Sequence, residues 1–429
     1  MIQKDNPKIV NAWAMYDWAN SVYSLVITST IFPIYYNSIT NVNGSDDVVF
    51  LGMHFRNTAL YSYALSFSFL LIAFLSPLLS GIADYIGNKK KFMQFFCVLG
   101  SVSCSMLYFF KDISMLWLGI TAFIFASIGF AGSIVFYNAF LPEVASSEKQ
   151  DKVSAKGFAL GYAGSSILLI ANLVMITFYK ELGFSNAAEP SRISFLLTGL
   201  WWLGFALITF TIVPEIKSKQ KFEFGFLFRG YEEIQKVWRQ LKALKALRTF
   251  LISFFFYNMG VQTVMYVAAL FGDKEIKMES SQLIITILII QFVAMAGAYL
   301  FSTLSKKFSN LIALSVAVSI WILICFCAYM TYKPGPFMAL AAIVGMVMGG
   351  VQSLSRSTYS KMLPETKDHA SFFSFYDVCE KTGLVLGTAS YGMIEEVTGS
   401  MRNSIFALAL FFVAGLVFLT ITRKRIALL

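Results

Sequence analysis

Apolar runs long enough to cross a lipid bilayer recur along the whole of this 429-residue chain. A membrane-spanning helix needs roughly 20 consecutive, mostly apolar residues. The composition agrees, because 57% of the residues are hydrophobic and 14% are charged, whereas a soluble domain carries about 25% charged residues. We therefore predict an all-α, multi-pass integral membrane protein that has the lipid bilayer as its surroundings.

Twelve spans are expected, six on each side of a polar and basic segment. The first six are expected near residues 12–38, 57–82, 92–110, 114–140, 156–179 and 192–213. The second six are expected near 249–271, 281–304, 309–331, 336–360, 372–396 and 402–422. Two similar hydrophobic halves suggest a duplicated unit. The predicted fold is two pseudo-symmetric six-helix bundles, residues 1–213 and 249–429, joined by the linker 214–248.

The linker has the pattern of an amphipathic helix, because apolar residues recur at helical spacing among Lys and Arg. These residues are Ile234, Val237, Trp238, Leu241 and Leu244. Such a helix is expected on the inner membrane surface, where it tethers the halves and attracts anionic lipid. A regulatory docking site is the alternative interpretation.

The basic residues predict the orientation of the chain. Of the 34 Lys and Arg residues, 24 fall in segments on the same side as the N-terminus, and about eight fall in the opposite loops. Cytoplasmic loops carry the basic excess, so both termini are predicted to be cytoplasmic, in the inner membrane if the protein is bacterial. The same placement explains the net charge of +10 without a nucleic-acid partner. No cleavable signal peptide is evident, and the five cysteines lie in or beside apolar segments, which implies neither disulfides nor a metal site.

An internal repeat supports the duplication. At an offset of 222 residues, Ser133 aligns with Ser355 and Tyr137 with Tyr359, and the sequence Leu-Pro-Glu recurs at 141–143 and 363–365. Both copies end a span on the same side of the membrane. The repeats are therefore expected to be parallel and related by an axis along the membrane normal.

The first predicted span contains an acid, Asp17. At 100° per residue, a polar stripe on one face of that helix holds Asp17, Asn20, Ser21, Ser24, Thr28 and Tyr35. An ionised side chain in lipid costs several kcal/mol unless it faces protein or water. We therefore predict that this face lines a water-accessible substrate path between the two halves.

The loop after the second span, SGIADYIGNKKKF, resembles the signature loop of the major facilitator superfamily (MFS). Asp84 is followed three residues later by a glycine and then by three lysines. In that signature the acid pairs with bases or caps a neighbouring helix end, and so braces the inward-closed state. Ser80 is a departure, because the signature usually has glycine there and this chain has Gly81 one place later. An ordinary basic loop is the alternative.

Three further stretches resemble the vacuolar amino-acid effluxer-like branch of that superfamily. They are residues 16–21 (YDWANS), 154–162 (SAKGFALGY) and 350–357 (GVQSLSRS). The resemblance covers nearly the whole chain and implies twelve helices and a secondary transporter. Its named eukaryotic members export amino acids from the vacuole. One departure is that the branch often has an acid soon after the tyrosine of its seventh span, where this chain has Tyr257-Asn258-Met259-Gly260.

Five charged residues lie within predicted spans, namely Asp17, Arg356, Asp377, Glu380 and Lys381. Asp377 and Lys381 are one helical turn apart and are expected to pair. One interpretation is a salt-bridge lattice that closes the inner gate between the halves. In the other, Asp17 or Glu380 titrates to couple protons and Arg356 holds a substrate carboxylate, because a guanidinium binds carboxylates bidentately. Static structural pairing is a third interpretation.

Polar side chains nearer mid-depth are the predicted substrate contacts. They are Asn20, Ser24, Tyr137, Asn258, Gln262 and Gln352, with Arg356 as the charged member of the set. The resemblance implies that spans one, four, seven and ten, which hold these residues, line the cavity. The alternative for each amide is a hydrogen bond between helices.

The predicted function is secondary active transport of a small polar solute, with an amino acid or related zwitterion first, by alternating access. A proton or another ion is the candidate coupling partner, and we expect a monomer without a cofactor. A non-transporting membrane sensor or accessory protein is the alternative. The only histidines, His54 and His369, fall outside the predicted spans, which argues against an intramembrane enzyme, and no GxxxxGK[ST] phosphate loop favours a primary pump.

Overall fold

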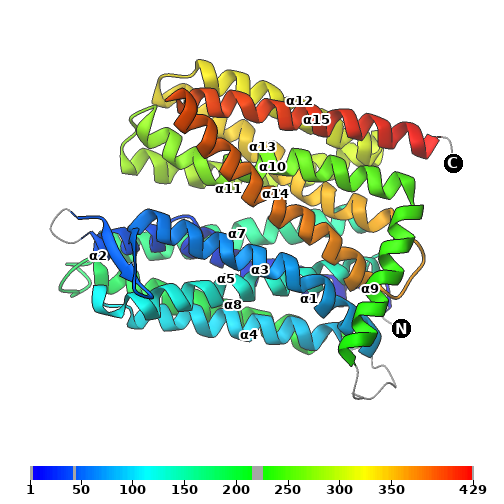
Figure 1. The fold of residues 1–429 in the computed structure, drawn as a ribbon, viewed down its shortest axis with the longest axis horizontal. Helices are drawn as coiled ribbons and strands as arrows, with labels where there is room; N and C mark the ends of the chain where they lie inside the picture. The colour runs from blue at the N-terminus through cyan, green and yellow to red at the C-terminus, as the bar shows by residue number, and fades with distance from the viewer. Residues whose placement is uncertain (1–2, 42–44, 215–225, 428–429) are drawn as a thin grey trace.

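The computed structural model describes residues 3–41, 45–214 and 226–427. Long, roughly parallel helices make up the molecule (Figure 1). In the first half the helices are α1 (Pro7–Val22), η1 (Tyr23–Thr28), α2 (Ile31–Thr40), α3 (Asn57–Ile86), α4 (Lys89–Met106), η2 (Leu107–Phe109), η3 (Ile113–Met115), α5 (Leu116–Ala139), α6 (Leu141–Val144), α7 (Gln150–Thr177) and α8 (Ala188–Ile212). In the second half they are α9 (Phe226–Ala243), α10 (Lys245–Lys274), α11 (Ser280–Phe308), α12 (Asn310–Met330), α13 (Pro334–Lys361), α14 (His369–Thr398) and α15 (Met401–Ala427).

Within the described residues, ten helices are long and apolar enough to cross a membrane. They are α3, α4, α5, α7, α8, α10, α11, α12, α13 and α15. The other two predicted spans are helical as well, but α14 carries Asp377, Glu380 and Lys381 in its first half, and the first span is interrupted. The chain is a multi-pass membrane protein, and the number twelve remains a prediction.

The expectation of one continuous helix over residues 12–38 is wrong. After α1 the chain passes through the π-helical η1, and the helix then breaks at Ser29 before α2 begins. Pro33 explains the break, because its ring has no N–H and collides with the carbonyl of the residue four places earlier. The predicted polar stripe therefore cannot extend to Tyr35, whose hydroxyl instead donates to the carbonyl of Phe110 at 2.5 Å.

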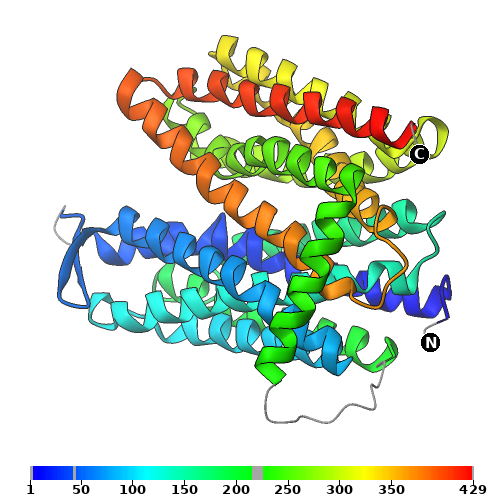
Figure 2. The same cartoon turned by 45° about the vertical axis from the view of Figure 1, so that its right-hand side comes forward.

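The helices lie in two groups. Helices α1 to α8 form the lower group in Figure 1, and α10 to α15 form the upper group. Helix α14 runs along the boundary and packs on α3 and α5 of the lower group, while α7 packs on α11 and α13 (Figure 2). The most extensive contacts between the groups come from these helices.

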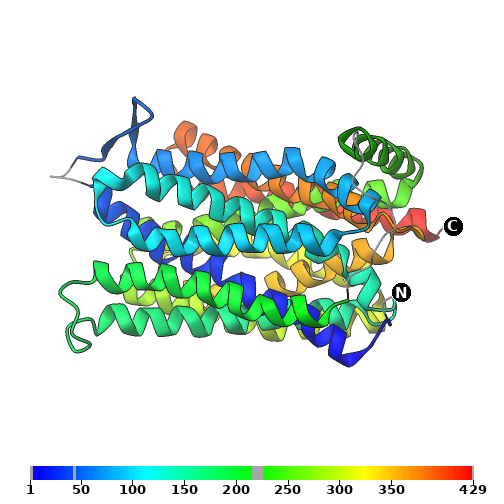
Figure 3. The same ribbon diagram turned by 90° about the horizontal axis from the view of Figure 1, so that it is seen from below.

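Helix α9 and both termini lie at the same end of the molecule, which we call the α9 end (Figure 3). At the opposite end, β1 (Asp47–Phe50) and β2 (Met53–Arg56) form an antiparallel hairpin (Figure 1). Its two-residue turn has positive φ at Leu51 and Gly52, as type I′ hairpin turns require.

The linker helix packs on protein as well as facing outward. Helix α9 contacts α3, α10 and α14, and Val237 and Leu241 on its apolar face are buried. Helix α9 thus crosses both groups of helices, and its placement on the inner membrane surface stays a prediction. Residues 215–225 of the predicted linker lie outside the described residues.

Candidate functional site

The three stretches that resemble the effluxer-like branch meet in space. Residues 16–21 lie in α1, 154–162 in α7 and 350–357 in α13, and α7 packs against both of the other helices. Along α13, every residue from 353 to 360 is buried, on all sides of the helix. A contact between the two groups is therefore built from these stretches, and Asp17 and Arg356 lie at its centre.

Asp17 is buried against protein, with 7% of its surface exposed. One carboxylate oxygen, Oδ2, accepts hydrogen bonds from the hydroxyl of Tyr137 at 2.7 Å and from Nη1 of Arg356 at 3.1 Å. The expectation of an acid that faces a water-accessible path is wrong for this conformation. The protein compensates the buried charge with a base from the other group of helices.

Arg356 is 3% exposed and makes four hydrogen bonds. Its Nε and Nη2 donate to the hydroxyl and carbonyl of Ser154, both at 2.9 Å, and Nη1 donates to Asn138 at 3.3 Å as well as to Asp17. The ring of Phe158 lies 4.1 Å from the guanidinium carbon. This planar guanidinium, with four hydrogen bonds to the first group of helices, fixes the relative position of the two groups.

Gly157 makes room for this ion pair. A Cβ atom there would lie 2.4 Å from Oδ2 of Asp17 and 2.9 Å from Nη2 of Arg356. One turn later, a Cβ at Gly161 would lie 2.5 Å from the hydroxyl of Ser21. The glycines of the second stretch are therefore explained by close packing around the ion pair, a role that the sequence pattern alone did not reveal.

The predicted substrate contacts do not gather in one place. Tyr137 belongs to the Asp17 cluster, and Gln352 accepts a hydrogen bond from Tyr162 of α7 at 2.5 Å. Ser24 donates within its own segment to the carbonyl of Ser21 at 3.0 Å. Asn20 is buried, and its amide nitrogen has no hydrogen-bond partner. Their role as substrate contacts therefore remains a prediction.

Asn258 and Gln262 lie beside a second group of charges, on α14. Gln262 donates to Oε1 of Glu380 at 3.1 Å, and Asn258 donates to the Glu380 carbonyl at 3.5 Å. The predicted pair within this helix is confirmed, since Nζ of Lys381 lies 2.8 Å from Oδ1 of Asp377. The same nitrogen lies 3.8 Å from Oε2 of Glu380. We call Asp377, Glu380 and Lys381 the α14 triad.

Asp84 caps α14 from the other group of helices. Its carboxylate accepts the backbone N–H groups of Ala370 at 3.3 Å and Ser371 at 2.7 Å, in the first turn of that helix. A negative charge at this position is favoured by the helix dipole. Nearby, Glu143 accepts a hydrogen bond from Lys89 and contacts Nδ1 of His369 at 3.0 Å. These contacts have the geometry of a brace, although its effect on conformation remains a prediction.

Gly81 explains the shifted glycine of the signature loop. A Cβ at Gly81 would lie 2.3 Å from the carbonyl oxygen of Gly230, where α9 crosses α3. On its other side α9 reaches the second group, because Lys236 contacts Asp368 at 2.7 Å. Burial favours the neutral form of Asp368, but the hydrogen bond from Lys236 lowers the pKa of this carboxyl below its usual range. Helix α9 thus contacts both groups beside the Asp84 cap.

A further contact between the two groups of helices was not predicted from the sequence. Oδ2 of Asp151, at the start of α7, contacts Nζ of Lys361 at 2.5 Å, and Oδ1 accepts from Asn310 at 2.7 Å. The internal repeat is the sequence signal that points to this contact, because Asn310 aligns with Asn88 at the same offset of 222. The preceding residues, Gly87 and Ser309, both have positive φ.

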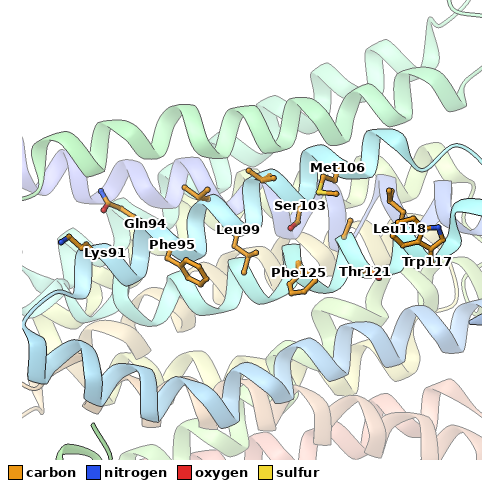
Figure 4. A pocket seen from close by; sticks show the side chains of 13 residues that line it. Lys91, Gln94, Phe95, Leu99, Ser103, Met106, Trp117, Leu118, Thr121 and Phe125 are labelled. Atoms are coloured by element: carbon orange, nitrogen blue, oxygen red, sulfur yellow. The ribbon is translucent and has the colours of Figure 1, made fainter. Parts of the chain in front are cut away.

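The cavity in Figure 4 is separate from these clusters. It has a volume of about 880 Å³ and lies between α4 and α5, with none of the predicted site residues in its lining. Phe95, Val98, Trp117 and Phe125 in its lining are exposed hydrophobic side chains. It is therefore an apolar surface groove. Across residues 3–41, 45–214 and 226–427, no group of three or more His, Cys, Asp or Glu residues is arranged to hold a metal ion.

Comparisons with known proteins agree with this arrangement. The MFS-type transporter YxiO of Bacillus subtilis is 33% identical over 97% of this chain and 95% of its own length. Autophagy-related protein 22 of Kluyveromyces lactis is 26% identical over 95% of this chain and 92% of its own. Among solved structures, the MFS transporter FucP in the outward conformation has a TM-score of 0.72 at 12% identity, over 97% of this chain and 99% of its own.

A bacterial homologue of the iron transporter ferroportin, in the outward-facing state, has a TM-score of 0.66 at 10% identity and covers 98% of this chain and 99% of its own. At such low identities these two structures show the fold alone. The family model described as "Vacuole effluxer Atg22 like" matches residues 5–426. The chain therefore belongs to the Atg22-like vacuole effluxer family, a branch of the MFS transporters.

Proposed function

We propose that this chain is a secondary active transporter that moves a small polar solute, with an amino acid or related zwitterion first, by alternating access. Membership of the MFS supports transport itself. The amino-acid assignment rests on the vacuole effluxer description of the family, and the polar residues beside Glu380 suit a polar solute.

The observation that carries the proposal is the buried ion pair between Asp17 and Arg356, which joins the two groups of helices. In alternating access the contacts between the halves at one end must break when that end opens. A buried ion pair of this kind joins the two groups while water is excluded. Separating its partners without water would leave a buried charge unpaired, which is unfavourable. We propose that the pair belongs to the closed gate.

In the proposed topology the α9 end is cytoplasmic, with both termini inside and twelve spans. The N-terminal bundle is residues 1–213, the linker 214–248 and the C-terminal bundle 249–429. The basic residues support this orientation. With the α9 end closed, we assign this conformation to the outward-facing state of the transport cycle. We propose a monomer, in the inner membrane if the protein is bacterial.

Arg356 is assigned to the gate in this proposal. Its four hydrogen bonds leave little capacity for a substrate carboxylate in this conformation. A carboxylate would have to displace Asp17. Substrate recognition is instead assigned to the amides of α10 and α13, namely Asn258, Gln262 and Gln352, together with Asn20 and Ser24 of the first span.

The test is solute counterflow in proteoliposomes that contain the purified protein. Vesicles loaded with one unlabelled amino acid at a time are mixed with a trace of the labelled compound, and panels of peptides and nucleosides follow. We expect exchange of at least one zwitterion, and much slower exchange with Asp17→Asn in vesicles that contain equal amounts of folded protein. If no solute exchanges, the sensor or accessory interpretation gains support. Equal exchange by the wild type and Asp17→Asn contradicts the gate assignment.

A further inference from the structure

The groove between α4 and α5, which we call the α4–α5 groove, lies apart from the charged clusters (Figure 4). Both helices are long and apolar enough to cross the bilayer, so their exposed side chains face lipid. The buried residues of the lining include the small Ser103 and Ala122, and the exposed ones include the bulky Phe95, Trp117 and Phe125. Small residues at the base and large ones at the rim explain why the surface is hollow here.

The two helices already touch each other at their glycines. A Cβ atom at Gly129 of α5 would lie 2.4 Å from Cα of Gly100 of α4, and one at Gly132 would lie 2.5 Å from the ring of Phe96. Small residues at such crossings let membrane helices approach closely. Because the backbones are in contact there, the helices cannot close the α4–α5 groove by moving together, and another molecule has to fill it.

Polar and apolar residues are unevenly distributed along the groove. Lys91, the charged member of the lining, and Gln94 lie at the α9 end, and Trp117 lies at the opposite end (Figure 4). Most of the lining between them is apolar. Lys91 also closes a run of three lysines that begins at Lys89. The matching ligand is an amphiphile that has a negatively charged head at the α9 end and a long hydrocarbon body.

The dimensions of the groove fit the chains of a phospholipid. From Lys91 to Met106 the lining follows α4 over about 22 Å, at 1.5 Å of rise per residue. An extended chain covers about 1.2 Å per bond, as a peptide backbone does, so a chain of roughly 18 bonds has this length. The volume of about 880 Å³ holds about 29 groups of the size of a water molecule or a methylene, at about 30 Å³ each. This number is close to that in the two chains of one phospholipid.

We propose that the α4–α5 groove binds a phospholipid with an anionic headgroup. Its phosphate lies beside Lys91, and its acyl chains follow the groove toward Trp117. Lysines near the membrane surface attract anionic lipid, and basic pockets between spans on the cytoplasmic side hold anionic headgroups. With the α9 end cytoplasmic, as proposed above, the lipid comes from the inner leaflet. The inference goes beyond the proposed transport and does not depend on the solute.

A second copy of this chain is a less suitable occupant. A two-fold interface places the same surface on both partners, so that surface has to be complementary to itself. Two hollow surfaces that face each other leave a space between them. In a membrane the two copies also have the same orientation, so Lys91 of one copy would lie at the same depth as Lys91 of the other, with like charges facing.

The first experiment compares two headgroups on the same acyl chains. Full-length protein is stripped of lipid in detergent and titrated with phosphatidylglycerol or phosphatidylcholine, and native mass spectrometry measures the lipid retained. We expect the anionic lipid to be retained about fivefold better, the size expected for one lysine near an anionic surface. Lys91→Gln should make retention equal, whereas Lys306→Gln, an exposed lysine of α11 at the same end, should keep the preference.

The second experiment blocks the groove without changing charge. Val102→Trp places a bulky ring in the lining, and Val417→Trp on α15 is the matched control, because the two valines are 48% and 49% exposed. We expect at least about tenfold weaker retention of phosphatidylglycerol in Val102→Trp, because losing apolar contact for two methylenes has this effect. The control should bind like the wild type.

A third measurement locates the chains. Phosphatidylglycerol with brominated acyl chains quenches nearby tryptophan fluorescence, and we expect the part quenched at low lipid-to-protein ratio to disappear in Trp117→Phe. This readout, together with Lys91→Gln, decides the matter if Val102→Trp does not fold. Equal retention of the two lipids by the wild type, unchanged retention in folded Val102→Trp, or unchanged quenching in Trp117→Phe overturns the inference. A dimer that Val102→Trp dissociates would also overturn it and assign the groove to a second copy.

Discussion

The Asp17–Arg356 pair and the α14 triad place charges at the same interface in opposite ways. The pair takes one acid and one base from different groups of helices and surrounds them with hydrogen bonds. The triad takes its three charges from one helix, where Nζ of Lys381 lies 2.8 Å from Asp377 and 3.8 Å from Glu380. A charge-balanced contact with several hydrogen bonds across the boundary is suited to hold two bodies together, whereas charges on one helix move with that helix as a unit. The difference separates a contact that joins the two groups of helices from a cluster that one helix carries.

Removal of Arg356, the base of the Asp17–Arg356 pair, is expected to have the largest effect. Arg356→Ala takes away four hydrogen bonds and leaves Asp17 buried without its partner. Loss of one member of a buried pair costs about 3–5 kcal/mol, so we expect the closed state to be destabilised by an amount of this order. Thermal unfolding in detergent and cysteine labelling at the α9 end measure it, with exposed Lys306→Ala as the matched control. Equal labelling in both variants would count against a gate.

A methyl group at Gly157 tests whether the close packing around the pair matters. The new Cβ in Gly157→Ala would lie 2.4 Å from Oδ2 of Asp17, so the pair must shift. Overpacking of this kind costs about 1–3 kcal/mol. We expect a lower unfolding temperature and slower exchange, while Gly204→Ala, whose Cβ meets no atom within 4 Å, should behave like the wild type. The same behaviour in both variants would show that the pair tolerates displacement.

Asp84→Asn tests the capping of α14 apart from the triad, because it removes a charge that acts on this helix without touching Asp377, Glu380 or Lys381. The charged cap on Ala370 and Ser371 would be weakened, and a helix cap contributes about 1 kcal/mol. We expect a modest rise in cysteine accessibility at the α9 end. Asp112→Asn removes a similar cap from the 3₁₀-helix η3 and serves as the control. Equal accessibility in Asp84→Asn and the wild type would count against a brace.

The smallest effect is expected at α9. The Lys236 side chain is 52% exposed, and an exposed ion pair contributes less than about 1 kcal/mol. Lys236→Ala should therefore leave exchange and unfolding close to those of the wild type and raise accessibility only slightly. Gly230→Leu should act more strongly, because this residue packs against Ile82 of α3. The reverse order of effects would place the control of the gate in the ion pair of α9.

Features encoded by neighbouring residues could be predicted from the sequence, whereas contacts between residues far apart in the chain could not. Apolar runs and the spacing of Asp377 and Lys381 are local signals, so the spans and the pair within α14 could be predicted. The break at Ser29 is also encoded locally, by Pro33, but an apolar run hides it. The partner of Asp17 could not be predicted, because Arg356 lies 339 residues away.

The roles of the small residues at the site were the hardest to predict from the sequence. Ser154 and Gly157 lie in one of the stretches used for the resemblance, yet their roles depend on the guanidinium and carboxylate that pack against them. Likewise Gly81 is explained only by the crossing of α9. A repeat-based comparison of Asn88 with Asn310 could have drawn attention to the Asp151 contact.

The most direct test of the central claim is the distance between the two groups of helices at the α9 end. Spin labels at Lys152→Cys on α7 and Lys307→Cys on α11 are both exposed, in a protein whose reactive native cysteines have been replaced. Pulsed electron paramagnetic resonance then gives the distance distribution. We expect a dominant short distance with the Asp17–Arg356 pair intact, and a shift of population to longer distances in Arg356→Ala. An unchanged distribution in that variant would contradict the assignment of the pair to the gate.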